Sequence, residues 1–247
     1  MRTLAVCLSL LALACASTSD SAHDGASART SASSSRPLAD LMPRPLQPFT
    51  LRATAKSAPS LVDVLLELER ATGAHFVVPD EAREQLARAS SGLLSDLEVP
   101  PEAAWRVVQT MLVENGFVVE PSRGGAPVTV TLASRTSRGS GTLKERAVVV
   151  DAAEIEACVD LPAVIFLVVV EVEALDARQL STTLRQLYPD QQTQSILPTT
   201  DSQLVLVGLG PTLAESVRMI RTCDAEERQK REEQRAKSAA DPSAAPR

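Results

Sequence analysis

Residues 184–211 read LRQLYPDQQTQSILPTTDSQLVLVGLGP. Within them, Thr193–Leu197 and Gln203–Val207 are two short β-like runs. The four residues between the runs, 199–202, are Thr, Thr, Asp and Ser, which are frequent in turns. The segment therefore predicts two neighbouring strands that are joined by a tight turn.

Amphipathic segments flank this pair of strands. The preceding one begins at Asp176 and ends at Tyr188 before a proline. Pro211 opens the following one, and the apolar run Ile165–Val172 precedes them all. The order strand, helix, strand, strand, helix predicts a small two-layer α/β unit.

The composition excludes one large class of function. Of the 247 residues, 44% are hydrophobic and only 2% are aromatic, and the formal net charge is −6. Nucleic-acid binders normally carry a basic face, and single-strand binders also need stacking aromatic rings. We therefore expect no nucleic-acid partner.

The N-terminus has the pattern of an export signal. Arg2 supplies a short positive region, and Leu4–Leu13 is apolar but too short for a membrane-spanning helix. The following Leu11–Cys15 resembles a lipoprotein cleavage box, in which Cys15 becomes the lipidated first residue. Ala12-Leu13-Ala14 also fits an ordinary A-x-A site. We expect an exported, periplasm-facing outer-membrane lipoprotein, or alternatively a soluble periplasmic protein.

Two cysteines remain beyond the export signal and its lipidation site. Cys158 and Cys223 lie in a compartment that allows a disulfide between them. The other interpretation is that each is a small buried apolar side chain. Sequence alone leaves both open.

The first folded unit begins near Phe49. A strand is expected at Phe49–Ala53, and Ser60 then caps a helix, with Asp63 completing a capping box and Gly73 ending the helix. The later elements expected in this unit are a strand at 75–78, a short helix or loop at 80–91, a weak strand at 92–99, a helix from Pro101 to Asn115, and a hairpin of 117–120 with 128–132 across Gly124-Gly125.

Composition shifts then give the domain boundaries. We expect an α+β fold of two small two-layer α/β domains, βαββαββ followed by βαββα. The predicted segments are a signal peptide at 1–14, a Ser/Ala/Pro-rich tether at 15–47, a first domain at 48–135, a linker at 136–146, a second domain at 147–225, and a charged, partly disordered tail at 226–247.

The first domain resembles the signalling-type (STN-like) domain at the N-terminus of secretins and of some TonB-dependent receptors. The similarity is carried by LRAT…SLVDVLLELERATGAHFVV and by LEVPPEAAWRVVQTMLVENGFVVE. In that family, the second helix of the domain runs directly into the final hairpin. Its counterpart here is Glu102–Phe117.

The second domain resembles the repeated KH-like N domain of secretins, the ring-forming channels of type II and type III secretion and of type IV pili. The similarity is carried by ALDARQLSTTLRQLYPD and TTDSQLVLVGLGPTLAESVRMIRTCD. Asp201 and Ser202 stand where the family usually has a turn Asn, and both residues suit a turn. Cys223 stands where the family pattern I-x-x-L-D has Leu, which favours a buried thiol over a disulfide.

The resemblance implies an interaction module. Secretins continue into a β-region that forms the pore, and this chain ends at Arg247, so we expect a secretin-like accessory protein. Its implied partners are a secretin or other secretion or pilus proteins, further copies of itself, and the membrane through a lipid anchor. Thr193–Leu197 and Phe49–Ala53 are candidate edge strands, which either pair with a partner or are covered by the tether or linker.

The sequence fits two other functions less well. An STN-type envelope sensor would call for a transmembrane segment or a regulator, and the sequence after the export signal contains no such segment. An enzyme would need a base or a metal set, yet His75 is the only histidine in the two domains, since His23 lies in the tether. Without a phosphate-binding glycine loop or Cys/His metal spacing, we expect no catalytic residue, cofactor or metal site.

Overall fold

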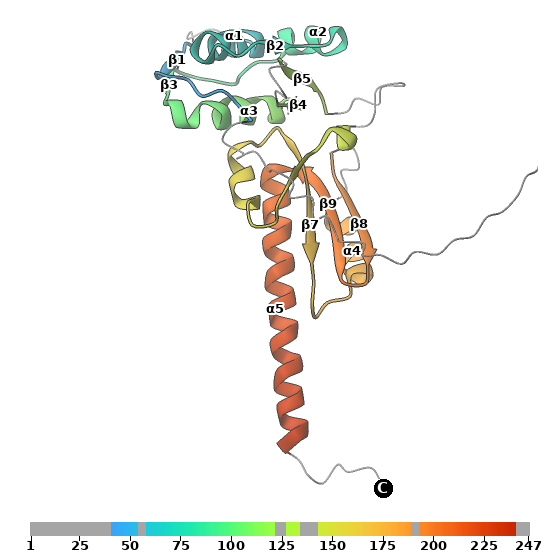
Figure 1. Ribbon diagram of the computed structural model, residues 1–247. Helices are drawn as coiled ribbons and strands as arrows, with labels where there is room; N and C mark the ends of the chain where they lie inside the picture. Colours follow the sequence, from blue (N-terminus) through green and yellow to red (C-terminus); the bar gives the residue numbers. More distant parts are fainter. Residues whose placement is uncertain (1–40, 54–57, 122–126, 134–142, 189–192, 241–247) are drawn as a thin grey trace, which may run out of the picture. The chain divides into compact units, whose positions relative to one another are not determined.

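The computed structural model describes residues 41–53, 58–121, 127–133, 143–188 and 193–240 (Figure 1). The predicted export signal, Cys15 and most of the predicted tether lie outside these residues. For clarity, residues 41–133 are called the first half and residues 143–240 the second half. Both belong to one compact unit, Ser35–Arg247.

The first half contains five short strands and three helices. In chain order they are β1 (Phe49–Leu51), α1 (Leu61–Thr72), β2 (Phe76–Val77), α2 (Asp80–Arg88), β3 (Leu97–Val99), a 3-10 turn (Pro101–Ala103), α3 (Ala104–Glu114), β4 (Phe117–Glu120) and β5 (Val128–Leu132). β1 pairs with β3 in a two-stranded antiparallel sheet, and a second sheet has the order β2-β5-β4. The segment at 80–91, for which helix and loop were both open, forms α2.

Local chemistry explains the bounds of α1. The Ser60 hydroxyl accepts a hydrogen bond from the Asp63 N–H, and the Asp63 carboxylate accepts one from the Ser60 N–H, each at 3.2 Å. Gly73 ends the helix in the left-handed region at φ 69°, which favours glycine. The apolar stripe of α1 is fully buried. The predicted capping box and stop are thus confirmed.

The second half is built on one four-stranded sheet. Its elements are a 3-10 turn (η3, Leu143–Arg146), β6 (Val148–Val150), a 3-10 helix (η4, Ile155–Asp160), β7 (Ile165–Glu171), α4 (Ala177–Leu187), β8 (Ser195–Thr200), β9 (Gln203–Leu209) and α5 (Gly210–Ala240). The sheet order is β6-β7-β9-β8, in which β9 is antiparallel to both β7 and β8. The predicted strand, helix, strand, strand, helix order is confirmed, preceded by β6 and η4.

The two faces of this sheet differ. Because side chains alternate along a strand, one face carries Phe166, Val168, Leu204, Leu206 and Ile196, which join a single buried core with side chains of α4 and α5. The residues that alternate with these along each strand point to the opposite face of the sheet, which is called the open face below. Sheet and helices therefore make two layers.

α5 is one continuous helix (Figure 1). The part of α5 up to Asp224 packs on the sheet and on η4, whereas the side chains of residues 225–238 are largely exposed. Residues 226–240 of the predicted charged tail belong to this helix. Residues 241–247 lie outside the described part of the chain.

The two halves share hydrogen bonds at Ala163, in the loop before β7. The Val119 N–H of β4 donates to the Ala163 carbonyl at 2.8 Å, and the Ala163 N–H donates to Oε1 of Gln109 at 3.0 Å. Gln109 and Ala163 are both completely buried. A single residue of the second half thus has both backbone groups bonded to the first half.

Parts of the predicted tether and linker are also ordered. Met42 is buried, and the indole N–H of Trp105 donates to the Pro43 carbonyl at 2.6 Å. Leu143–Arg146, at the end of the predicted linker, form η3, and Arg146 contacts Glu120 at 2.9 Å. The residue limits of the two predicted domains remain predictions.

Candidate interaction surfaces

The lone histidine of the predicted domains lies on the surface. His75 is exposed, and its Nδ1 lies 3.3 Å from a carboxylate oxygen of Glu69. In the described residues, no three His, Cys, Asp or Glu side chains are grouped as a metal site. Within the same residues, no helix has the length and apolar character needed to cross a bilayer.

Cys158 lies in η4 and Cys223 lies in α5. Although η4 packs against the start of α5, Cys223 is several turns further along that helix. Cys158 is buried in η4, and burial, followed by the negative charge of Glu154, raises the pKa of its thiol to about 12. Its carbonyl lies against Gly210 at the start of α5, whereas Cys223 follows thirteen residues later, about 20 Å along the helix. Both thiols are free.

Cys223 is exposed, so the expectation that it is a buried thiol is wrong. The inward positions of this turn are Ile220 and Asp224, which are one helical turn apart. A Cys158–Cys223 disulfide remains a prediction, and forming it would require α5 to move relative to η4, because bridged Cα atoms lie within about 7 Å.

The open face of the second sheet carries apolar side chains. Val169, Val205 and Leu197 are aligned across β7, β9 and β8, so they form one row. Val169 is 40% exposed and Leu197 is 51% exposed. Val149 on β6, whose neighbour across the sheet is Leu167, is 65% exposed.

The part of this face around Ile165 and Val207 is covered by other parts of the chain. Val118 of β4 and Ala147 pack with Ile165 and Val207 in a small separate core, and Leu143 packs against it. The apolar surface that stays exposed is therefore confined to the part of the face around Val149, Val169 and Leu197. Contiguous exposed apolar surface of this kind is typical of protein interaction sites.

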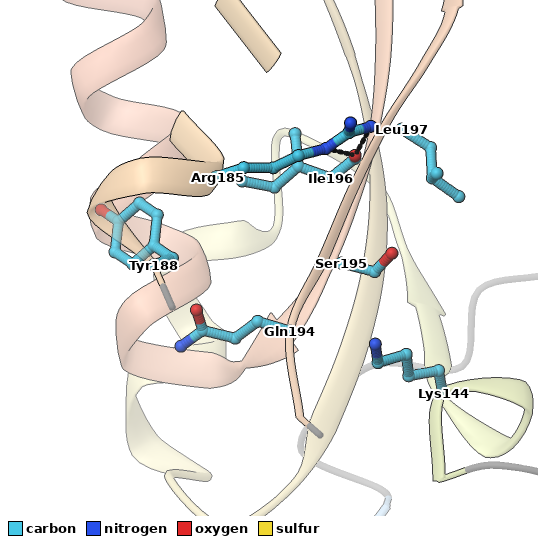
Figure 2. A pocket seen from close by; sticks show the side chains of 7 residues that line it. All are labelled: Lys144, Arg185, Tyr188, Gln194, Ser195, Ile196 and Leu197. Carbon is cyan, nitrogen blue, oxygen red and sulfur yellow. Dashed lines mark hydrogen bonds between the residues drawn. The ribbon is translucent and has the colours of Figure 1, made fainter. Parts of the chain in front are cut away.

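A groove of about 410 Å³ runs along the outer edge of β8. Figure 2 shows Arg185, Tyr188 and Gln194 on one side of the strand, and Ser195, Leu197 and Lys144 on the other. Arg185 and Tyr188 come from the end of α4, and Lys144 comes from η3. The strand edge thus lies between two cationic side chains.

β8 is an edge strand, as predicted, but it is poorly suited to accept another strand. Its outward carbonyl at Ile196 accepts hydrogen bonds from Nε and Nη2 of Arg185, at 3.0 and 2.7 Å. By alternation, Pro198 faces the same way and has no N–H to donate, and the pairing register shifts after it. These features are typical of edges that resist strand addition.

Sequence reasoning did not find this groove. Lys144 lay in the predicted linker, and Arg185 lay off the apolar stripe of its helix, eleven residues before the carbonyl that it binds. The only available signal was that Thr193–Leu197 would be an edge strand. The other predicted edge, β1, is paired with β3 on one side, and the Ala53 N–H after it donates to Asp96 at 2.8 Å.

The fold and these surfaces define an α+β protein with an apolar sheet face and a basic groove beside it. No family model matches the chain, and no curated protein matches it. It is similar to a chain of the Klebsiella pneumoniae type II secretion system outer membrane complex, a structure with PulD, PulS and the PulC HR domain. The TM-score is 0.49 at 13% sequence identity, and the match covers 70% of this chain and 26% of that chain.

Proposed function

We propose that this protein is a non-enzymatic assembly module of a bacterial secretion or pilus-type machine, comparable to the periplasmic part of a secretin. The observation that carries the proposal is the apolar row Val169, Val205 and Leu197 on the open face, in which Val169 and Leu197 are exposed and Val205 is partly buried. The choice of machine rests on the sequence resemblance of 48–135 to STN-like domains and of 147–225 to KH-like secretin N domains.

An exposed row of this kind favours binding for a simple reason. Each Val or Leu side chain that moves from water into a packed interface contributes about 1.5–3 kcal/mol when burial is complete. The exposed residues are already half-buried by their strands, so their remaining exposed area contributes less. A partner that also contacts Val149 buries more of the exposed apolar area of this face, and its binding free energy is more favourable for that reason.

Anchoring belongs to the same proposal. Export followed by lipidation at Cys15 would hold the module at the outer membrane, with residues 16–40 between the lipid and the described fold. Incorporation of labelled lipid, lost in Cys15→Ala, tests this part. Incorporation that persists in the variant would contradict it.

The sheet-face proposal is tested by Val169→Glu. In cross-linked envelope extracts, the wild-type protein is expected to capture secretin or inner-membrane machine components that mass spectrometry identifies. Val169→Glu places a charge in the middle of the apolar row, which costs several kcal/mol if the residue becomes buried at an interface. We therefore expect capture to be lost.

Leu94→Glu is the matched control, because Leu94 is 95% exposed and lies in the first half, away from the open face. Its capture of the same components should equal that of the wild-type protein. Equal capture by Val169→Glu, or capture of no secretion or pilus component by the wild-type protein, would overturn the proposal.

A further inference from the structure

We propose that the groove along the outer edge of β8 binds an extended acidic peptide segment of the partner, whose carboxylates pair with Lys144 and Arg185. The inference rests on the proposed function, since it names the chemistry of the partner. Apart from Leu197, which belongs to both surfaces, it depends on different residues from the apolar row, and it is tested separately.

The charges of the groove are the first argument. Arg178, two turns earlier on α4, pairs with Asp201 at 2.9 Å. In contrast, neither Arg185 nor Lys144 has a carboxylate within ion-pair distance among the residues that the structure describes, and none of the described groove-lining residues is acidic. Among the described lining residues, these two cations therefore give the groove a positive charge, opposite to the net charge of −6 of the chain as a whole.

The position of Arg185 is the second argument. Its Nε and one Nη2 hydrogen are used by the Ile196 carbonyl, which fixes the plane of the guanidinium beside the strand. A guanidinium has five N–H groups, so three remain for a ligand. Because the side chain is already held in place, a carboxylate that binds there orders little additional structure.

The shape of the groove indicates an extended peptide. It follows Gln194–Leu197, about 10 Å of strand. Lys144 and Arg185 lie on opposite sides of that strand (Figure 2), so two separate carboxylates match them better than one small anion. The blocked edge at Ile196 and Pro198 means that recognition uses side chains instead of an added strand.

Apolar groups in the same groove complete the match. Leu197 is half-exposed on the same side of the strand as Lys144, with Ser195 between them, and the Tyr188 ring lines the groove on the Arg185 side (Figure 2). A peptide with an apolar residue between two acidic ones would therefore place all three side chains. This pattern of alternating acidic and apolar residues is the partner chemistry that the groove selects.

The test uses the full chain and a fluorescently labelled hexapeptide of alternating Glu and Leu, with a Gln-for-Glu peptide as the ligand control. Anisotropy should show binding of the Glu peptide alone, weakening as salt screens the charges. In the double variant K144Q/R185Q we expect its affinity to fall about tenfold or more. The double variant R178Q/K237Q removes the same charge from exposed sites outside the groove and should bind like wild type.

Absence of binding to the wild-type protein up to about 1 mM peptide would overturn the inference. Equal affinity in K144Q/R185Q, with circular dichroism showing both proteins folded, would also overturn it. Arg185→Lys separates charge from geometry: it keeps the charge and loses the double contact to Ile196, so an intermediate affinity is expected. If peptide binding fails while Val169→Glu still abolishes partner capture, the groove is wrong and the proposed function stands.

Discussion

Asp224 connects the last helix to the loop between β7 and α4. Its carboxylate accepts hydrogen bonds from the consecutive N–H groups of Glu173, Ala174 and Leu175, at 2.8–3.1 Å. Burial alone would raise the pKa of Asp224. The three N–H groups, together with Arg228, outweigh burial and hold that pKa below its ordinary value of 3.8.

We expect Asp224→Asn to lower the free energy of unfolding by about 2 kcal/mol at neutral pH, because an amide accepts fewer and weaker hydrogen bonds. A carboxyl group whose pKa is lowered by folding stabilises the fold above its ordinary pKa. That contribution is lost as the pH falls through the lower folded-state value. The difference between wild type and variant should therefore shrink below about pH 4 in urea unfolding.

Asp201→Asn is the control for this measurement, because the Asp201 carboxylate forms an exposed ion pair with Arg178. Such pairs contribute about 0–1 kcal/mol, so little change is expected at either pH. A loss in Asp224→Asn that is equally large at pH 7 and pH 3 would show that its charge is not responsible.

At the scale of elements, α5 begins in close contact with η4. A Cβ atom on Gly210 would overlap the carbonyl oxygen of Cys158, and it would lie 3.1 Å from the carbonyl oxygen of Leu161. The contact is to backbone, which cannot rotate away as a side chain can. Glycine is required at this position by the close approach, not by its φ angle.

Gly210→Ala should therefore destabilise the protein by about 1–3 kcal/mol, as overpacking of a rigid contact does. Gly208→Ala is a matched control in the same segment, since its Cβ would meet Gln194 and Leu213 at 3.7 Å or more. Thermal unfolding should shift markedly for Gly210→Ala and little for Gly208→Ala. The reverse order would contradict the described approach of α5 to η4.

Elements whose ends are set by neighbouring residues could be predicted from the sequence. The limits of α1 follow from Ser60, Asp63 and Gly73, all within one or two turns, and the strand pair in 193–207 follows from its turn residues. Pairings that join distant segments could not be predicted. β2 lies parallel to β5 and β6 parallel to β7, and no local pattern marks these partners.

The same limit explains why the groove was missed. Lys144 and Arg185 are separated by some forty residues in sequence, and they line one groove only because the fold brings η3 and the end of α4 to the two sides of β8. Neither residue carries a motif of its own. Edge position could be predicted from one strand, whereas the charge beside that edge depends on the folded arrangement of three elements.

At the scale of the molecule, the two buried hydrogen bonds of the Ala163 backbone couple the unfolding of one half to the unfolding of the other. Gln109 supplies one acceptor, and its Nε2 has no hydrogen-bond partner among the described atoms. The chain has a single tryptophan, Trp105 in the first half, which lines a pocket with Ala157, Asp160 and Leu161 of the second half, so its fluorescence reports on the first half and on this contact. Circular dichroism reports on both halves together.

In the wild-type protein we expect the fluorescence and dichroism transitions to coincide, as in two-state unfolding. Gln109→Leu leaves the buried Ala163 N–H without an acceptor and should cost about 1–3 kcal/mol. Because the lost bond joins the halves, the two transitions should separate. The exposed substitution Gln179→Leu should leave them coincident, and separate transitions already in the wild type would contradict this coupling.

The hydrogen bonds that the Asp224 carboxylate accepts from residues 173–175 also affect the time course of folding. Its carboxylate and the N–H groups that it binds are 49 to 51 residues apart in sequence. Contacts between distant residues form slowly, because a long loop has to close first. As the chain is synthesised, the loop at 173–175 can reach its final hydrogen bonds only after residue 224 has left the ribosome. The second half therefore completes its folding late, when α5 arrives.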